Sequence, residues 1–70
     1  MDYLVIFEKG LQGYGAYVPD LPGCVAAGNT LDEVRDLIRE AIPLHVYAMR
    51  EHGEPVPSPT SVADTVRVAG

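Results

Sequence analysis

The chain has few of the residues that form the disulfides and metal sites which commonly stabilise a small domain. Its 70 residues include one cysteine and no tryptophan. An internal disulfide needs two cysteines, and neither of the two histidines has a thiolate pair beside it, so neither a disulfide framework nor a zinc site is expected. A domain this short buries only about 60% of its unfolded surface and usually needs added support. Self-association is the support that remains.

Long apolar segments and basic side chains are also scarce. No stretch approaches the roughly 20 apolar residues of a membrane-spanning helix, and the N-terminus lacks the basic start of a secretory signal. With a free thiol, these features lead us to expect a cytoplasmic protein. Five Lys and Arg stand against ten Asp and Glu, a net charge of −5. This balance disfavours nucleic acid, whose affinity rests on phosphate contacts, and favours a basic protein partner.

The segment VPDLPGC at residues 18–24, here called the proline loop, organises the chain. Pro19 and Pro22 fix φ and remove amide donors, which excludes regular structure. Asp20 is suited to bonding nearby backbone, and Gly23 tolerates a positive φ. Such a stiff loop has two interpretations. It is a rigid connection between strands, which is the commoner use of these residues, or a preformed recognition surface.

Three short strands are predicted around this loop. The apolar run at residues 3–7 predicts a strand buried on both faces, and residues 14–18 return after a turn with two glycines. Residues 24–28 form a third strand, with Cys24 as a small buried apolar residue and not a nucleophile. One face of the first strand packs on the helix. The other needs cover, which again indicates a second subunit.

One long helix follows the strands. Thr30 and Glu33 have the spacing of a capping box, and apolar residues recur at helical spacing over residues 34–49. Pro43 lies inside this pattern and costs about 3 kcal/mol unless the helix bends. Because the pattern continues past it, we predict one kinked helix that ends at Gly53.

A proline-spaced connector at residues 54–59 comes next, and the valines of residues 60–68 predict a final edge strand. The predicted fold is therefore α+β. It has the order β-β-β-α-β, with a small, mainly antiparallel sheet and the Pro43-kinked helix on one face. A chain of this length forms a single domain, residues 1–70.

No catalytic signature is present. The glycines of residues 10–15 lie in a hairpin, the wrong context for phosphate binding. His45 has the spacing of a partly buried helix residue, and nothing marks it as a general base. A magnesium site would have to gather Glu8, Asp20 and Glu40, which the sequence does not indicate. We therefore expect no enzymatic activity, cofactor or metal.

Four segments together resemble the HicB-like antitoxin family. They are PDLPGC at residues 19–24, GNTLDE at 28–33, EAI at 40–42 and GEPVPSP at 53–59. Each is weak alone, but the set is specific and extends over essentially the whole chain. The resemblance implies a partial RNase H-like fold, which agrees with the predicted order.

The resemblance also implies a binding module. HicB-like antitoxins pair with small basic HicA-type mRNA interferases and cover the toxin's catalytic histidine and RNA-facing surface. They are usually oligomeric, and many carry a C-terminal DNA-binding domain. Only residues 60–70 follow the connector here, too few for a helix-turn-helix, so direct DNA binding is not expected.

The leading hypothesis is an antitoxin-like module that neutralises a HicA-type toxin by occluding its active site. The alternatives are a stand-alone homo-oligomeric regulatory or structural domain and a reduced RNase H-like, magnesium-dependent nuclease. For the partner surface we select Tyr14, Tyr17, Asp20 and Leu21. Tyrosines are common interface anchors, although strands favour aromatic residues as well. Asp20 and Leu21 are expected on the exposed side of the proline loop.

Overall fold

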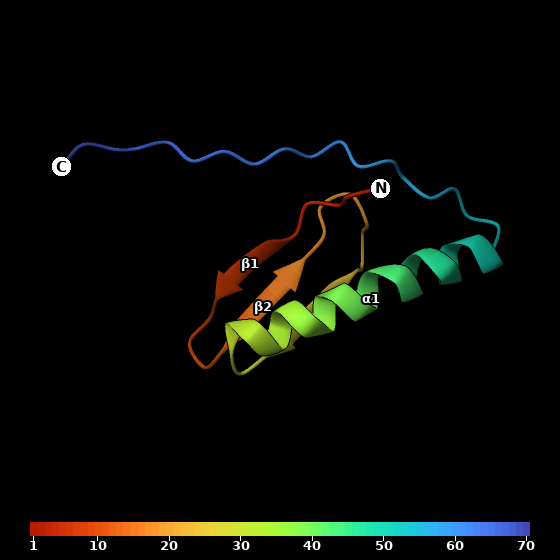
Figure 1. Ribbon diagram of the computed structural model, residues 1–70, viewed down its shortest axis with the longest axis horizontal. Coiled ribbons are helices and arrows are strands. Elements are labelled where there is room, and N and C mark those ends of the chain that lie inside the picture. Colours follow the sequence, from red (N-terminus) through yellow and green to blue (C-terminus); the bar gives the residue numbers. More distant parts are fainter.

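The computed structural model describes residues 1–70 and consists of three strands and one helix. The elements are β1 (Ile6–Lys9), β2 (Tyr14–Tyr17), β3 (Val25–Gly28) and α1 (Leu31–Glu51). The strands form one antiparallel sheet in the order β1-β2-β3, and α1 packs against one of its faces (Figure 1). The predicted small antiparallel α+β fold, with three strands before the helix, is confirmed.

The core lies between α1, the sheet and the proline loop. Tyr3, Val5 and Phe7 pack against it, as the alternation in the first strand predicted. Only six of the 70 residues are buried, so the single chain has a small core. The buried residues are all apolar: Ala16, Val18, Leu21, Cys24, Val34 and Ile38.

The start of α1 is fixed by its cap. Thr30 Oγ1 accepts a hydrogen bond from the Glu33 N–H at 3.1 Å, and Glu33 Oε2 accepts one from the Asn29 N–H at 3.2 Å. The capping box is thus present, although its return bond comes from the residue before Thr30. The helix continues through Pro43 as one element, as predicted. It lacks the apolar length needed to cross a membrane.

The end of α1 is a Schellman motif. Gly53 has φ +69°, its N–H donates to the Arg50 carbonyl at 3.1 Å, and the Glu54 N–H donates to the Met49 carbonyl at 2.9 Å. This pair of bonds satisfies carbonyls that a helix end otherwise leaves free. The left-handed conformation carries little cost for glycine, which confirms Gly53 as the terminating residue.

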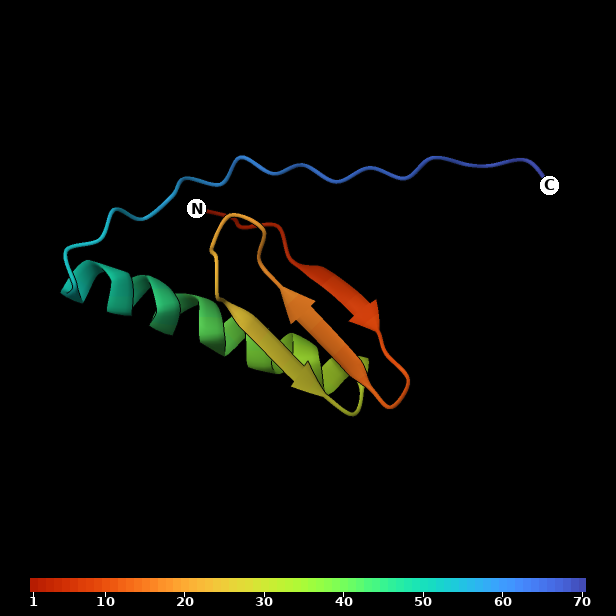
Figure 2. The same ribbon diagram turned by 180° about the vertical axis from the view of Figure 1, so that it is seen from behind.

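The predicted final strand is absent. Beyond Gly53 the chain forms no strand, and both views show it passing the N-terminus and continuing beyond the sheet (Figures 1 and 2). Val62, Val66 and Val68 are exposed. The alternating valines have the pattern of a strand, but in the single chain no neighbouring strand completes it. β1 also begins later than predicted, at Ile6 and not at Tyr3.

Candidate partner-binding surface

The proline loop is closed by its own backbone hydrogen bonds. The Val18 N–H donates to the Cys24 carbonyl at 3.2 Å, and the Leu21 N–H donates to the Val18 carbonyl at 3.0 Å. The Cys24 N–H donates to the Leu21 carbonyl at 3.1 Å, and Gly23 takes a φ of +85°. The loop is therefore the stiff connection that the sequence predicts.

The side chain of Leu21 is buried inside the proline loop. It is 0% exposed, so the expectation of an exposed Leu21 is wrong. The hydrogen bonds just described turn every third residue of the loop inward, and Val18 and Cys24 are buried beside it. The sequence feature that indicates this burial is the three-residue spacing of the apolar residues Val18, Leu21 and Cys24.

Asp20 binds the chain's own C-terminal segment. Its Oδ2 accepts hydrogen bonds from the N–H groups of Thr60 at 3.0 Å and Ser61 at 2.9 Å. Its Oδ1 accepts from the hydroxyls of the same residues, at 3.1 Å and 2.9 Å. We call this arrangement the Asp20 clamp. It fastens the segment after the connector to the proline loop.

The clamp changes the acidity of Asp20. The Ser61 N–H has the largest effect and lowers the pKa of the Asp20 carboxyl below its usual value of 3.8. Desolvation opposes this shift, while the Ser61 hydroxyl and both Thr60 groups add to the lowering. The carboxylate is thus stabilised in its charged form by donors from its own chain.

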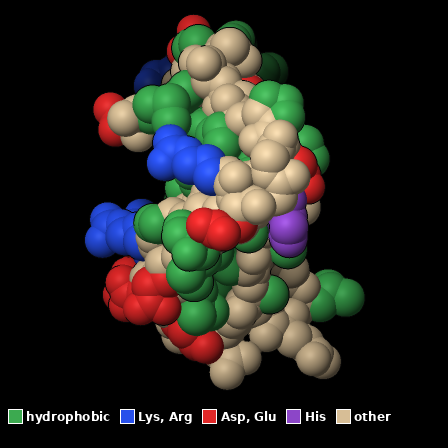
Figure 3. All heavy atoms as spheres, turned by 90° about the vertical axis from the view of Figure 1, so that its right-hand side faces the viewer, with side chains coloured by type: hydrophobic (Ala, Val, Ile, Leu, Met, Phe, Trp, Pro, Cys, Tyr) green, Lys and Arg blue, Asp and Glu red, His purple; other side chains and the backbone are tan.

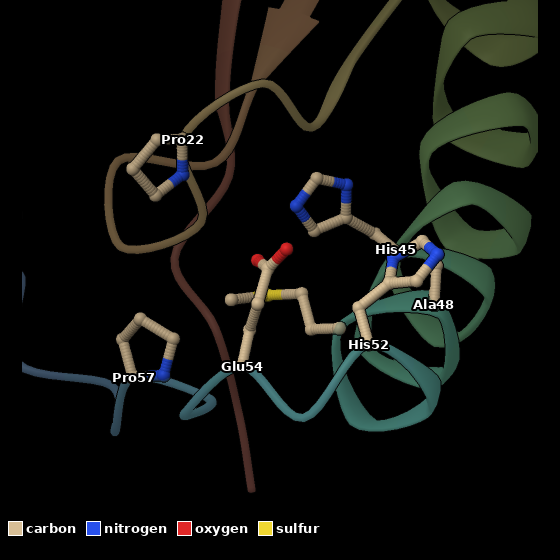
Figure 4. Close-up of a pocket in the computed structure, with 7 residues that line it drawn as sticks. Pro22, His45, Ala48, His52, Glu54 and Pro57 are labelled. Atoms are coloured by element: carbon tan, nitrogen blue, oxygen red, sulfur yellow. The ribbon is translucent and has the colours of Figure 1, made fainter.

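A pocket of about 410 Å³ lies between the proline loop, the end of α1 and the connector (Figure 4). His45 and His52 enter it from α1 and the helix end, Pro22 from the proline loop, and Glu54 from the connector. A Cβ added to Gly23 would lie 3.8 Å from His45 Cε1, so this imidazole packs beside the loop. The complete lining is Pro22, His45, Ala48, Met49, His52, Glu54 and Pro57.

The sheet face opposite α1 is uncovered and carries an apolar row across all three strands. Ile6 pairs with Tyr17, and Tyr17 pairs with Val25, so the three side chains share one face. Tyr17 is 40% exposed and Val25 64%. We call these three residues the open-face row. Tyr14 lies on the other face and packs against the core, so the two tyrosines do not form one surface.

The residues do not assemble a metal centre. No group of three or more His, Cys, Asp or Glu side chains lies close enough to hold an ion. The gathering of Glu8, Asp20 and Glu40 that a nuclease would need is therefore not found, and Asp20 is engaged in its clamp. Cys24 is 3% exposed, and burial raises the pKa of its thiol above the usual 9.0. It is the buried apolar residue that the sequence predicts.

Comparison with known proteins identifies close relatives. An uncharacterised 14.9 kDa protein of Haemophilus phage HP1 is 44% identical over 57 residues, covering 81% of this chain and 43% of the relative. A UPF0150 protein of Thermoplasma acidophilum is 37% identical over 67 residues, covering 94% of this chain and 97% of the relative. The chain thus spans less than half of the phage protein and nearly all of the archaeal one.

A solved structure shows the same fold. A chain from a HicA3 and HicB3 toxin-antitoxin complex superposes with a TM-score of 0.72 at 35% sequence identity, covering 86% of this chain and 70% of that one. The family model for the HicB-like antitoxin of bacterial toxin-antitoxin systems matches residues 3–69. The chain therefore belongs to the HicB-like antitoxin family.

Proposed function

We propose that this chain is an antitoxin that binds a small basic HicA-type mRNA interferase and neutralises it by occluding the active site. The observation that carries the proposal is the likeness to a chain from the HicA3 and HicB3 complex, at 35% identity over 86% of this chain. The family match over residues 3–69 supports the same role.

The open-face row makes the uncovered sheet face the candidate toxin-binding surface. The chain has a net charge of −5, which suits a basic partner and speeds its approach. The open-face row supplies an apolar centre, and aromatic residues such as Tyr17 often anchor interfaces. At the end of the molecule where α1 ends, hydrophobic side chains also lie exposed among acidic and basic groups (Figure 3).

The predicted partner residues contribute in different ways. Tyr17 presents its side chain on the uncovered face. Tyr14 packs on the core beneath it, Leu21 fills the proline loop, and Asp20 holds the C-terminal segment. In this proposal Tyr17 contacts the toxin, and the other three residues keep the surface in shape.

Inhibition by occlusion requires no catalytic chemistry from the antitoxin. A basic RNase binds its substrate through phosphate contacts, so an acidic protein on the same surface competes with RNA for the same cations. Such a complex excludes RNA by steric overlap as well. Inhibition is then expected to follow the amount of complex formed and to reach completion at equal amounts of the two proteins.

The test is a search for a small basic protein encoded beside this gene, followed by co-expression of the two proteins. We expect the two proteins to co-purify and the chain to stop RNA cleavage by the toxin. Tyr17→Ala is expected to weaken inhibition by about 30-fold, the loss of a hot-spot residue worth about 2 kcal/mol. Tyr47→Ala is the matched control, because Tyr47 is also exposed, at 64%, but lies on α1.

Failure to co-purify, or full RNA cleavage in the presence of excess chain, would rule out this role. An equal loss of inhibition in both tyrosine variants would contradict the assignment of the toxin interface to the sheet face. A chain that associates only with itself would support the alternative of a stand-alone homo-oligomeric domain. The unpaired C-terminal segment is the observation that favours this alternative.

A further inference from the structure

The pocket beside the end of α1 has walls that are held in place at three points. The proline loop, which carries Pro22, is closed by its own hydrogen bonds. The backbone of Glu54 is fixed, because its N–H donates to the Met49 carbonyl at 2.9 Å. The Tyr3 hydroxyl donates to the Pro57 carbonyl and holds the connector. The pocket, of about 410 Å³, is therefore already formed in the free chain, and ligand pockets commonly have about 300–1,000 Å³.

The polar side chains of this pocket have no partners within the chain. The carboxylate of Glu54 takes part in no hydrogen bond or ion pair, and the same holds for the imidazoles of His45 and His52. Figure 4 shows the end of the Glu54 side chain directed into the space between Pro22 and the His45 ring. These groups are therefore available to a ligand that enters the pocket.

The charge of the pocket favours a cation. Glu54 is the one acidic residue in the lining, and no Lys or Arg lines the pocket. The last turn of α1 adds the negative end of the helix dipole, which attracts cations. Arg50, the basic residue of that turn, does not line the pocket. An anion would meet a carboxylate and a helix C-terminus, so the pocket disfavours phosphate and carboxylate ligands.

The flat surfaces of the lining favour a guanidinium over an ammonium group. Pro22 and Pro57 contribute their rings, and His45 and His52 contribute imidazoles. A guanidinium is planar, is more weakly hydrated than an ammonium and stacks on aromatic faces. It also binds a carboxylate through two parallel N–H donors, whereas an ammonium acts as a point charge. A guanidinium that stacks on the rings and donates to Glu54 therefore matches both the shape and the charge of the pocket.

We propose that this pocket is a guanidinium site, which takes an arginine side chain of the chain's basic protein partner. The Glu54 carboxylate accepts the hydrogen bonds of the guanidinium, and the rings of Pro22 and His45 flank it. The identity of the occupant rests on the proposed function, because a basic toxin is the protein that would supply the arginine. The pocket is a contact additional to the open-face row, with which it shares no residue.

The first test needs no toxin. The probe N-acetyl-arginine methylamide is titrated into the full ¹⁵N-labelled chain at about 0.15 M salt, and the amide chemical shifts are followed. We expect the shifts to be confined to the pocket and its neighbours in sequence. N-acetyl-citrulline methylamide has a similar shape without the charge, and N-acetyl-lysine methylamide has the charge without the planar fork. Both are expected to bind at least about tenfold more weakly.

Two glutamate variants separate the pocket from the general negative charge of the chain. Glu54→Gln is expected to raise the dissociation constant of the arginine probe at least about tenfold. It should leave the free energy of unfolding unchanged, because the Glu54 side chain is exposed and makes no bond. Glu51→Gln is the matched control, since it removes the same charge from an exposed position outside the lining. It should change the dissociation constant less than about twofold.

Three results of this titration would overturn the proposal. They are an arginine probe that causes no shifts at the pocket, a citrulline or lysine probe that binds as tightly, and an equal loss of binding in both glutamate variants.

The second test identifies the occupant in the complex with the toxin. Glu54→Gln is expected to weaken inhibition about tenfold, and Glu51→Gln to leave it unchanged. One toxin arginine, replaced by alanine, should cause the same loss with the unaltered chain and no further loss with Glu54→Gln. If no toxin arginine shows this coupling, the toxin does not fill the pocket and the proposal fails. If the unaltered chain inhibits no basic RNase, the proposed function fails, and the probe titration still decides whether the pocket binds a guanidinium.

Discussion

Asp20 joins segments that lie 40 residues apart in the sequence, and its replacement tests what the clamp does. Asp20→Asn keeps the size of the side chain but replaces one acceptor oxygen by a donor. We expect amide hydrogen exchange at Thr60 and Ser61 to become faster, with little change in global stability. Asp64→Asn is the matched control, because Asp64 accepts only from the adjacent Thr65. Unchanged exchange at Thr60 would show that the clamp does not hold the segment in solution.

The same carboxylate predicts a response to acid. Its pKa is lowered in the fold below 3.8, so the clamp contributes fully above that value and is lost as the pH falls through the lower, folded value. The amide chemical shifts of Thr60 and Ser61 should therefore move with a midpoint below 3.8. A midpoint at or above 3.8 would contradict the hydrogen bonds that the clamp requires.

Leu21 is the residue whose predicted and observed roles differ most. It is fully buried, so Leu21→Ala leaves a cavity and is expected to lower the free energy of unfolding by about 2–5 kcal/mol. Pro22→Ala, at the exposed neighbouring position, should cost much less. Urea denaturation of the two variants gives the comparison. A cost below about 1 kcal/mol for Leu21→Ala would place this side chain outside the core.

At the scale of the elements, Pro43 is the position where sequence and helix conflict. Proline lacks the N–H that an interior helix residue donates, and here the side chain is exposed, so it contributes little packing. Pro43→Ala is therefore expected to stabilise the chain by roughly 1–3 kcal/mol, measured by urea denaturation. A loss of stability would mean that a bend at Pro43 is needed to pack the two halves of α1 on the core.

The elements that the sequence predicts well are those with local causes. Thr30, Glu33 and Gly53 act on neighbours within a few residues, so both ends of α1 follow from the sequence. Val62 shows the opposite case, because alternation reveals an apolar side but not the strand that would lie beside it.

The candidate site was less predictable for the same reason. The two tyrosines were chosen together by type, yet the register of β2 sends Tyr14 to the core and Tyr17 to the open face. Asp20 is predicted to face a partner, whereas its carboxylate binds Thr60 and Ser61, which are distant in sequence and which nothing local marks as donors. The family resemblance, and not these residues alone, is what indicates the proposed function.

For the whole molecule, the self-association that the sequence predicts would make stability depend on concentration. A dimer whose chains unfold on separation gains about 1.4 kcal/mol of unfolding free energy for each tenfold rise in chain concentration. The urea midpoint of the full chain should therefore increase with concentration. A constant midpoint in the unaltered chain would mean that its six buried residues suffice without a second copy.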